Sequence, residues 1–518
     1  MSTPERANPF LRPARQPDPR VAAGDRPNII VITSDDQTRE MLSPKTMPAT
    51  WRLLVEPGLS FDNYIVSSPL CCPDRASFLT GQYPHNHRVL GNHYGELVDK
   101  QEVLPAWLRD SGYQTIHVGK YLNNYEVAVA DRSSVAPGWT DWYTFLQGRY
   151  FDYNLYVNGA TEHFGTDDAD YLPRVLNRIA VDSIARYGPA PRPFYLQLDQ
   201  FPPHFGSGPS TQGCEGAAVP DPRDTGRRTP QIEPTPWSKP SFNEPDFADK
   251  PPYMRDTPPL SRLEQRRLRE HFGCALRSLR AIDRGVAAIV GQLRRVGELN
   301  RTVIIFTSDN GYLFGEHRIP EGKEFPYREA FEVPLVIRAP PRLLVAKLRG
   351  TTNSAPVANI DLAPTILDWA KTTPCLNDGR CRSPDGASLA PFLRDQPDAW
   401  PSDRDRLIEL GLRTSDREQP WVCAFSALLG RSRLYVEHSL TARRAGRCEK
   451  SRAIEDYDLG ADPWQLDNLH RPGGGPSGAE RNLRRRLHRL ADCRGSRIGS
   501  EQPLRRTEDN RDADPYCD

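Results

Sequence analysis

The chain has 518 residues, a formal net charge of +1, 37% apolar and 26% charged residues, and 50 prolines. Its length allows one large α/β domain with an ample core and a smaller second domain. The near-zero net charge gives no indication of a nucleic-acid partner, and no run approaches the roughly 18 apolar residues that span a bilayer, so we expect neither nucleic-acid binding nor a membrane span.

Residues 1–26 are polar and rich in Pro and Arg, with no apolar segment that could form the core of a signal peptide. We expect a disordered leader there and, on this ground alone, a cytoplasmic protein by default. The cysteines indicate the opposite, because eight of the ten remain once Cys71 and Cys72 are set aside, and an even number fits disulfides in an exported protein. Reduced thiols fit equally well, so the compartment stays open.

Two continuous apolar, β-branched runs, residues 28–33 and 302–307, are typical of strands buried on both faces of a mostly parallel sheet. The first ends in Ser-Asp-Asp-Gln and the second in Ser-Asp-Asn-Gly. Because open α/β sheets bind ligands beyond the carboxyl ends of their strands, these two acidic ends predict one shared polar site.

Residues 70–81 predict a helix that begins near a pair of cysteines. Pro73 suits a first helical position, and the residues that follow can continue the turn. A side chain just ahead of that turn faces unpaired backbone N–H groups, and Arg75 adds a fixed positive charge. This arrangement would bind a tetrahedral oxyanion, although Cys71 and Cys72 taken alone are better interpreted as buried structural cysteines.

Further strands are expected at residues 114–118, 194–198 and 333–338, and a long helix at 261–297, whose apolar stripe belongs to the core. Residues 202–259 are dense in Pro, Gly and polar residues, so we expect a long surface excursion that serves as a lid or substrate wall. A helix should open near Ile360.

After about residue 395 the pattern changes to short alternating segments such as 432–437, which suit a small antiparallel sheet. The basic run 481–489 predicts a solvated helix face, and the end of the chain a mobile tail. The expected divisions are a leader at 1–26, a catalytic domain at 27–395, a C-terminal subdomain at 396–500 and a tail at 501–518.

Asp35 with Asp36, and Asp309 with Asn310, form two oxygen-rich pairs at the predicted strand ends. Carboxylate and amide oxygens suit a hard divalent cation, most readily Ca²⁺, with Mg²⁺ as the alternative; no cluster has zinc-ligand spacing. An isolated pair of this kind is more often a turn, because Asp and Asn favour turns on their own account.

The order Cys-x-Pro-x-Arg followed by Leu-Thr-Gly, starting at Cys71, resembles the signature of the type I sulfatases, in which a maturation enzyme oxidises the first cysteine to Cα-formylglycine. The family motif usually has a small residue at the position of Asp74, so this chain departs from the motif there. Further segments of this chain resemble the family's other motifs, in the same order along the chain: residues 28–37, 119–123, 203–204, 307–311, 322–323, 457–459, 462–463 and 468–469. The similarity spans 27–469, and residues 83–86 and 315–318 are most similar to the N-acetylglucosamine-6-sulfatase-like and arylsulfatase members.

This resemblance implies an alkaline-phosphatase-like α/β fold, with a large, mostly parallel mixed sheet between helices and a smaller C-terminal antiparallel sheet. It also implies one Ca²⁺ (Mg²⁺ being possible), held by Asp35, Asp36, the modified Cys71, Asp309 and Asn310. The hydrated aldehyde would supply a hydroxyl, held by the metal and Arg75, that attacks sulfur. Its second hydroxyl would then expel sulfate, a step that plain Ser or Cys cannot perform.

Lys120, His204 and Lys323 would, by the same resemblance, contact the sulfate oxygens, with His204 as general acid. Many relatives have His where this chain has Asn123, so the leaving-group acid stays open and Asn123 is a candidate substrate residue. His317 is a second candidate lining the substrate pocket.

The favoured hypothesis is therefore a sulfuric ester hydrolase acting on a sulfated sugar or aryl sulfate, with the maturation enzyme as a protein partner. A phosphonate or phosphate ester hydrolase of the same fold is one alternative, because metal, Arg and Lys also stabilise phosphoryl oxygens. A non-catalytic protein binding sulfated sugars is another, if Cys71 stays unmodified. A thiol hydrolase is less favoured, since no motif supplies a histidine partner for Cys71.

Overall fold

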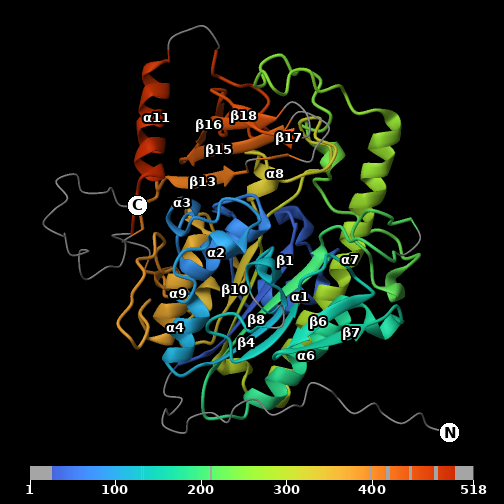
Figure 1. Ribbon diagram of the computed structural model, residues 1–518, viewed down its shortest axis with the longest axis vertical. Helices are drawn as coiled ribbons and strands as arrows, with labels where there is room; N and C mark the ends of the chain where they lie inside the picture. Colours follow the sequence, from blue (N-terminus) through green and yellow to red (C-terminus); the bar gives the residue numbers. More distant parts are fainter. Residues whose placement is uncertain are drawn as a thin grey trace, which may run out of the picture.

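A ten-stranded mixed sheet forms the centre of the molecule, in strand order β11-β2-β10-β9-β1-β8-β4-β5-β6-β7 (Figure 1). The computed structural model describes residues 26–129, 131, 134–210, 213–396, 400–412, 414–415, 421–442, 446–471, 476–495 and 517. The strands of this sheet are β1 (Asn28–Asp35), β2 (Leu59–Phe61), β4 (Gln114–Lys120), β5 (Asp141–Phe145), β6 (Tyr153–Val157), β7 (Ala160–Phe164), β8 (Phe194–Pro203), β9 (Thr302–Ser308), β10 (Leu335–Arg338) and β11 (Thr351–Asn353).

Strand β1 lies between β9 and β8 and is parallel to both, as its unbroken apolar pattern predicts. Its pairing with β9 runs in register from Asn28 opposite Thr302 to Ser34 opposite Ser308. The two polar strand ends identified in the sequence therefore reach the same edge of the sheet. Among the described strands of this sheet, antiparallel pairing occurs where β10 joins β9 and β2, and where β6 joins β5 and β7.

Helices cover both faces of the sheet (Figure 1). Ile29 and Val31 of β1 share a core cluster with residues of α2 (Cys71–Thr80), α4 (Leu104–Asp110) and α9 (Leu362–Ala370). Ile30 and Ile32 point to the other face, in the cluster that includes α6 (Leu172–Tyr187) and α7 (Arg262–Arg295). Because β1 is buried on both faces, apolar and polar residues do not alternate along it. The short helices are α1 (Pro48–Thr50), α3 (Pro84–His87), α5 (Tyr125–Ala128), α8 (Arg328–Phe331) and α10 (Ala390–Leu393).

A smaller antiparallel sheet near the C-terminus contains β13 (Arg406–Gly411), β15 (Trp421–Leu429), β16 (Arg433–Ala442), β18 (Glu449–Lys450) and β19 (Ile454–Asp458). Helix α11 (Gly478–Ala491) packs on it, seen at the upper left of Figure 1. Two further strand pairs are β3 (Tyr64–Ile65) with β12 (Val357–Ala358) and β14 (Thr414–Ser415) with β17 (Gly446–Arg447). The predicted mostly parallel sheet with a C-terminal antiparallel sheet, in an alkaline-phosphatase-like fold, is confirmed.

Helix α2 begins at Cys71, two residues before the predicted start at Pro73. Pro73 is tolerated as the third helical residue because the first turn's N–H groups have no intrahelical partner to lose. The reactive position therefore lies on the first turn itself and not ahead of it.

The excursion predicted at 202–259 differs from a loose surface lid. It carries two buried lysines, and Lys239 is held by Glu316 at 3.0 Å and Glu329 at 3.1 Å, on the segment that follows β9. Lys250 Nζ contacts Glu244 within the excursion at 3.1 Å and donates to the backbone carbonyl of Gln465 at 2.5 Å. These buried charges are paired, as burial requires, and they fix the excursion to the main domain.

Eight cysteines form four disulfides, Cys214–Cys274, Cys375–Cys381, Cys423–Cys448 and Cys493–Cys517, and Cys71 and Cys72 remain free. The sequence left open whether these eight cysteines form disulfides or stay reduced, and the structure shows disulfides. Within the described residues, no helix is both long and apolar enough to cross a bilayer. The predicted leader and tail lie outside the described residues, apart from Arg26 and Cys517.

Candidate active site

Nine side chains meet at the carboxyl edge of the large sheet, and we call them the strand-end cluster. They come from the ends of β1, β4, β8 and β9, from the first turns of α2, and from the loop after β9. Their members are Asp35, Asp36, Cys71, Arg75, Lys120, His204, Asp309, Asn310 and Lys323. All of the residues that the sequence assigned to catalysis and metal binding are in this set.

The chain turns sharply at Asp36, whose φ of 71° is in the left-handed region. Asp is among the few non-glycine residues that adopt this conformation at modest cost. The turn brings Asp36 against the second pair: its backbone N–H donates to Asp309 Oδ1 at 3.3 Å, and Asn310 Nδ2 donates to Asp36 Oδ1 at 2.6 Å. The two oxygen-rich pairs therefore converge, as the sequence predicted.

Arg75 connects three carboxylates. Its Nε donates to Asp309 Oδ2 at 2.9 Å, Nη2 contacts Asp35 Oδ2 at 3.5 Å, and Nη1 contacts Asp199 Oδ1 at 3.5 Å. Nη1 also donates to the backbone carbonyl of Lys120 at 2.9 Å. The guanidinium is 4% exposed, and although burial opposes its charge, the surrounding carboxylates raise the pKa of Arg75 above its ordinary value. Arg75 is thus a fixed, permanently charged centre of the site.

Cys71 lies between a carboxylate and an ammonium group. Its thiol contacts Asp35 Oδ1 at 3.5 Å, and Lys323 Nζ donates to Cys71 Sγ at 2.9 Å. Burial, followed by the Asp35 charge, raises the pKa of this thiol well above its ordinary value despite Lys120 and Lys323. An unmodified Cys71 is therefore protonated at neutral pH and is a poor nucleophile.

The two lysines each pair with one carboxylate of β1's end: Lys120 Nζ with Asp35 Oδ2, and Lys323 Nζ with Asp36 Oδ1. Burial opposes the charge of both lysines, but the surrounding acidic groups, with Asp35 foremost for Lys120 and Asp36 for Lys323, together raise the pKa of each. Both ammonium groups are therefore charged and point into the cluster, where they can bind an anionic group.

His204 lies at the rim, with Nε2 at 3.8 Å from Asp36 Oδ2 and Nδ1 at 2.7 Å from the carbonyl of Phe205. Burial lowers the pKa of His204 to about 4, although Asp36 and Asp35 act in the opposite direction. The Phe205 ring stacks on it with centroids 4.4 Å apart and is 48% exposed, so an apolar surface borders the cluster.

Two buried oxygens in the cluster, Asp36 Oδ2 and Asn310 Oδ1, have no hydrogen-bond partner. Ligand atoms of Asp35, Asp36, Cys71 and His204 also lie within 4.8 Å of one another. Carboxylate and amide oxygens with unused lone pairs are the donor set that Ca²⁺ and Mg²⁺ prefer. The residues therefore fit a hard divalent cation, and Asp35, Asp36, Asp309 and Asn310 would hold it.

Sequence reasoning missed the layer behind Arg75. Asp199 of β8 contacts Arg75 and accepts from Gln197 Nε2 at 2.8 Å, and His117 Nε2 of β4 lies 3.1 Å from it. These polar side chains are buried within otherwise apolar strands, and that break in the apolar pattern was the available signal. Asp199 therefore helps to orient the Arg75 guanidinium.

Three further residues that the sequence singles out, Asn123, His317 and Asp74, are not members of the strand-end cluster. The buried Oδ1 of Asn123 has no partner. His317 is buried, contacts Glu244 through Nδ1 at 2.7 Å and stacks on Tyr327, and its place in the substrate pocket stays a prediction. Asp74 is buried and accepts from Asn359 Nδ2, which gives this departure from the motif a structural partner.

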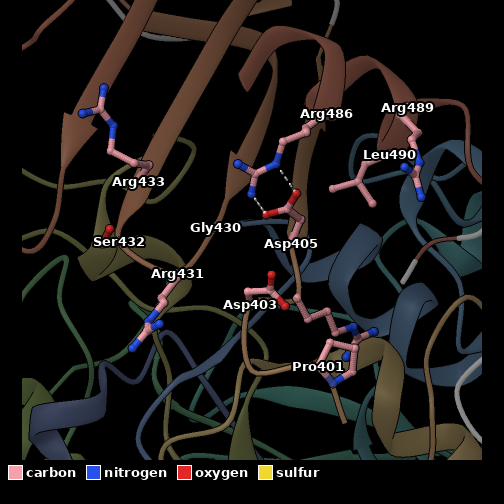
Figure 2. A pocket seen from close by; sticks show the side chains of 11 residues that line it. Pro401, Asp403, Asp405, Gly430, Arg431, Ser432, Arg433, Arg486, Arg489 and Leu490 are labelled. Atoms are coloured by element: carbon pink, nitrogen blue, oxygen red, sulfur yellow. Dashed lines mark hydrogen bonds and ion pairs between the residues drawn. The ribbon is translucent and has the colours of Figure 1, made fainter. Parts of the chain in front are cut away.

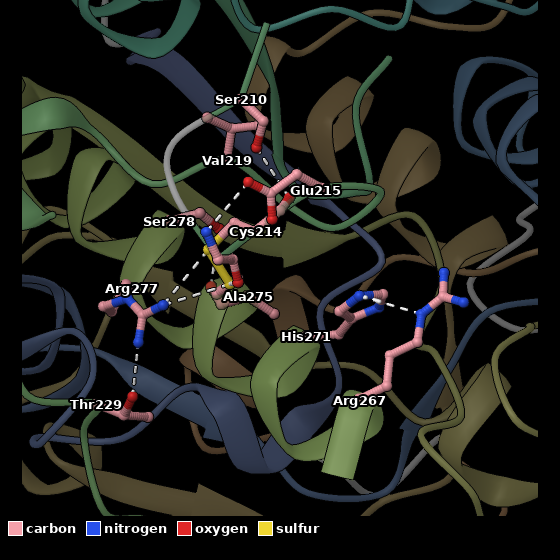
Figure 3. Close-up of a disulfide and its surroundings, with 12 residues drawn as sticks. Ser210, Cys214, Glu215, Val219, Thr229, Arg267, His271, Ala275, Arg277 and Ser278 are labelled. Carbon is pink, nitrogen blue, oxygen red and sulfur yellow. Dashed lines mark hydrogen bonds between the residues drawn. A yellow bond between two sulfur atoms is a disulfide. The ribbon is translucent and has the colours of Figure 1, made fainter. Parts of the chain in front are cut away.

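One wall beside the cluster is fixed by the Cys214–Cys274 disulfide, which joins the excursion to α7 (Figure 3). On the same helix, His271 contacts Glu321 at 2.9 Å, two residues before Lys323. A small cavity next to Asp36 is lined by Pro203, Phe205, Ala217, Ala218, His271, Ala275, Tyr312, Phe314 and Glu321. The disulfide and α7 therefore shape the space that borders the reactive residues.

Comparison with known proteins identifies the family to which this chain is similar. A sequence model of the sulfatase family matches residues 27–372. The chain is 33% identical to human N-acetylglucosamine-6-sulfatase, covering 87% of this chain and 82% of that protein. It is 30% identical to the arylsulfatase of Volvox carteri, covering 87% and 72%. It is also 32% identical to the Drosophila melanogaster protein named extracellular sulfatase SULF-1 homolog, covering 86% of this chain but only 37% of that protein.

Solved structures share the fold at lower identity. A protein in complex with its substrate D-glucosamine-2-N,6-O-disulfate has a TM-score of 0.63 at 21% identity, covering 89% of this chain and 97% of that chain. The phosphonate monoester hydrolase of Agrobacterium radiobacter has a TM-score of 0.61 at 19% identity, covering 86% and 91%. One fold thus carries both sulfate- and phosphonate-ester chemistry.

Proposed function

The chain belongs to the sulfatase family, and we propose that it hydrolyses the sulfate ester of a sulfated sugar, using formylglycine made from Cys71. The single observation that carries the proposal is the position of Cys71, on the first turn of α2 between Asp35 and the Lys323 ammonium. Sulfuric ester hydrolysis is the activity of the family; the nucleophile and the sugar are our proposals.

The protonation of Cys71 supports the modification. As a buried thiol with a raised pKa, it would attack a sulfate ester poorly. Oxidation to the aldehyde would supply a hydrated carbon with two hydroxyls, one to attack sulfur and one to release the sulfated intermediate.

The charge of each remaining residue in the strand-end cluster suggests its role in the reaction. Arg75, held by Asp309 and Asp35, would orient the nucleophile's oxygen and oppose developing negative charge. Lys120 and Lys323 would each bind a sulfate oxygen in place of part of their present contact with Asp35 and Asp36. His204, at the rim, would transfer a proton to the departing oxygen once the bound anionic ester has raised its pKa from about 4. A divalent cation, when bound by the four oxygen ligands, would polarise the nucleophile and the sulfate.

The sugar substrate is supported by the named relatives and by the local surface. Relatives at 31–33% identity are named N-acetylglucosamine-6-sulfatase, and the exposed Phe205 ring beside His204 offers an apolar face on which a sugar ring can stack. The four disulfides support work in an oxidising compartment.

The decisive experiment is the mass of the peptide containing Cys71, from protein made in a host with the maturation enzyme, before and after an aldehyde-trapping reagent. Conversion lowers the mass by about 18 Da and makes the peptide react with the reagent. Cys72 is an internal control, because it is equally buried and should remain an alkylatable thiol.

Two unmodified thiols would contradict the proposed nucleophile and favour a binding protein. Parallel assays with sulfate and phosphonate esters of the same phenol then test the reaction class. We expect faster hydrolysis of the sulfate ester, and a reversed preference would favour the phosphonate hydrolase.

A further inference from the structure

A second concave site, separate from the strand-end cluster, lies where the C-terminal sheet meets α11 (Figure 2). It is a cavity of about 660 Å³, within the range of ligand sites. Three segments line it: the loop at 401–405, the β15–β16 turn at 430–433, and the last turns of α11. We call it the arginine pocket, because its walls include Arg404, Arg431, Arg433, Arg486 and Arg489.

Three of these arginines have carboxylate partners that fix their positions. Arg486 forms a two-pronged pair with Asp405, drawn as dashed lines in Figure 2. Arg433 pairs with Asp456, and Arg404 pairs with Asp361 at 2.8 Å. These pairs form the frame of the pocket.

Arg431 and Arg489 are different. Both side chains are exposed, and no carboxylate among the described residues pairs with either. Figure 2 shows them on opposite sides of the pocket, with the Arg486–Asp405 pair between them. One extended ligand with several anionic groups can meet both guanidinium groups from within the pocket.

Gly430 and two apolar side chains complete the lining of the pocket. A side chain at Gly430 would place its Cβ 3.1 Å from both Arg486 Nη2 and Asp405 Oδ1, so glycine keeps the frame and the space above it intact. Pro401 and Leu490 add apolar surface to the walls. The lining contains no aromatic side chain on which nucleic-acid bases could stack.

We propose that the arginine pocket binds a second segment of a sulfated sugar chain, through its sulfate or carboxylate groups. The choice of a sugar rests on the proposed function. A polymer held at this pocket would raise the local concentration of sulfate esters near the same molecule's active site. Guanidinium groups suit this ligand, since their planar N–H pairs match the oxygens of sulfate and carboxylate.

The test uses the full chain with Cys71→Ala, which cannot turn over substrate by the proposed mechanism, and calorimetric titration with a heparin-derived octasaccharide. We expect the double variant Arg431→Ala/Arg489→Ala to bind about tenfold more weakly. The matched control is Arg481→Ala/Arg485→Ala, which removes the same charge from exposed positions of α11 outside the pocket lining. It should retain affinity within about twofold.

Equal affinity of the pocket variant and the parent would overturn the proposal, as would an equal loss in the control, which would indicate general charge attraction. Binding of poly-glutamate at the pocket with the same affinity would also overturn it in favour of an acidic peptide. With Cys71 restored, hydrolysis of a small aryl sulfate should be unchanged by Arg431→Ala/Arg489→Ala. Absence of that hydrolysis in the parent enzyme would count against the proposed function and leave the binding result to stand alone.

Discussion

Among the residues that the structure describes, two asparagines, Asn310 and Asn123, carry a buried side-chain oxygen without a hydrogen-bond partner. Leaving such an oxygen unpaired costs about 1–3 kcal/mol, so each calls for a physical reason. Asn310 lies in the strand-end cluster beside Asp36, where a cation would coordinate the free oxygen. Asn123 follows Lys120 in the chain, and in the described part of the structure no hydrogen bond joins it to Asp35, Asp36 or Asp309.

These two residues give a matched pair of variants. We expect Asn310→Ala to weaken Ca²⁺ binding by about tenfold or more, because one oxygen ligand is removed. Asn123→Ala should leave Ca²⁺ affinity unchanged. Titration of chelator-treated protein with Ca²⁺, followed by calorimetry, measures both affinities without any substrate. Equal Ca²⁺ affinities in the two variants would contradict the assignment of Asn310 as a ligand.

Strand β4 shows how one element positions a reactive side chain. Gly119 has a φ of 118°, and a Cβ there would lie 1.9 Å from the carbonyl oxygen of Asp199 on β8. Only glycine allows the two strands to approach so closely. Lys120 follows directly, so its ammonium reaches Asp35 only if this contact is kept.

We therefore expect Gly119→Ala to lower the free energy of unfolding by about 3 kcal/mol or more, because the backbone of β4 or β8 must move to make room for the Cβ. The same movement should displace Lys120 and reduce kcat severely. Gly159→Ala is the control: this glycine also has positive φ, at 91°, but its Cβ would meet nothing within 4 Å. It should cost about 1 kcal/mol and leave kcat unaltered. Denaturant unfolding and an aryl sulfate assay measure the two effects, and similar losses in both variants would show that the β4–β8 contact is unimportant.

At the scale of the whole molecule, His85 joins parts that are far apart in the sequence. On α3, it contacts Glu409 of β13 at 2.8 Å and the carbonyl of Cys493 at 3.0 Å. Burial disfavours its charge, but Glu409, together with the Cys493 carbonyl and Asp385, raises the pKa of His85 to about 9, from an ordinary 6.5. Because the folded-state pKa is raised, the stabilisation is complete below about pH 6.5 and is lost as the pH rises through about 9.

We expect the melting temperature to fall between pH 6.5 and 9 by an amount equivalent to about 1–3 kcal/mol, and His85→Gln to remove that part of the pH dependence. Scanning calorimetry across this range measures it. His163→Gln, at a histidine whose side chain is 62% exposed, should keep the parent's profile. A parent-like profile for His85→Gln would exclude this ion pair as the source of the pH dependence.

The division into a catalytic domain at 27–395 and a C-terminal subdomain at 396–500 remains a prediction. The antiparallel strands start at Arg406, but one core cluster contains both Val31 of β1 and Tyr435 of β16. Their apolar side chains are therefore buried together, and the two sheets should unfold as one unit.

The sequence alone determined the buried strands β1 and β9, their acidic ends and the helix that carries Cys71, because apolar patterns and turn-forming residues act over a few neighbouring positions. It left the pairing of the cysteines open. Only the tertiary structure decided that pairing, and only the structure placed Asp199 behind Arg75, buried His317 against Tyr327, and assembled the arginine pocket from three separate segments. These contacts join residues far apart in the chain, so they depend on how the elements pack and not on any local pattern.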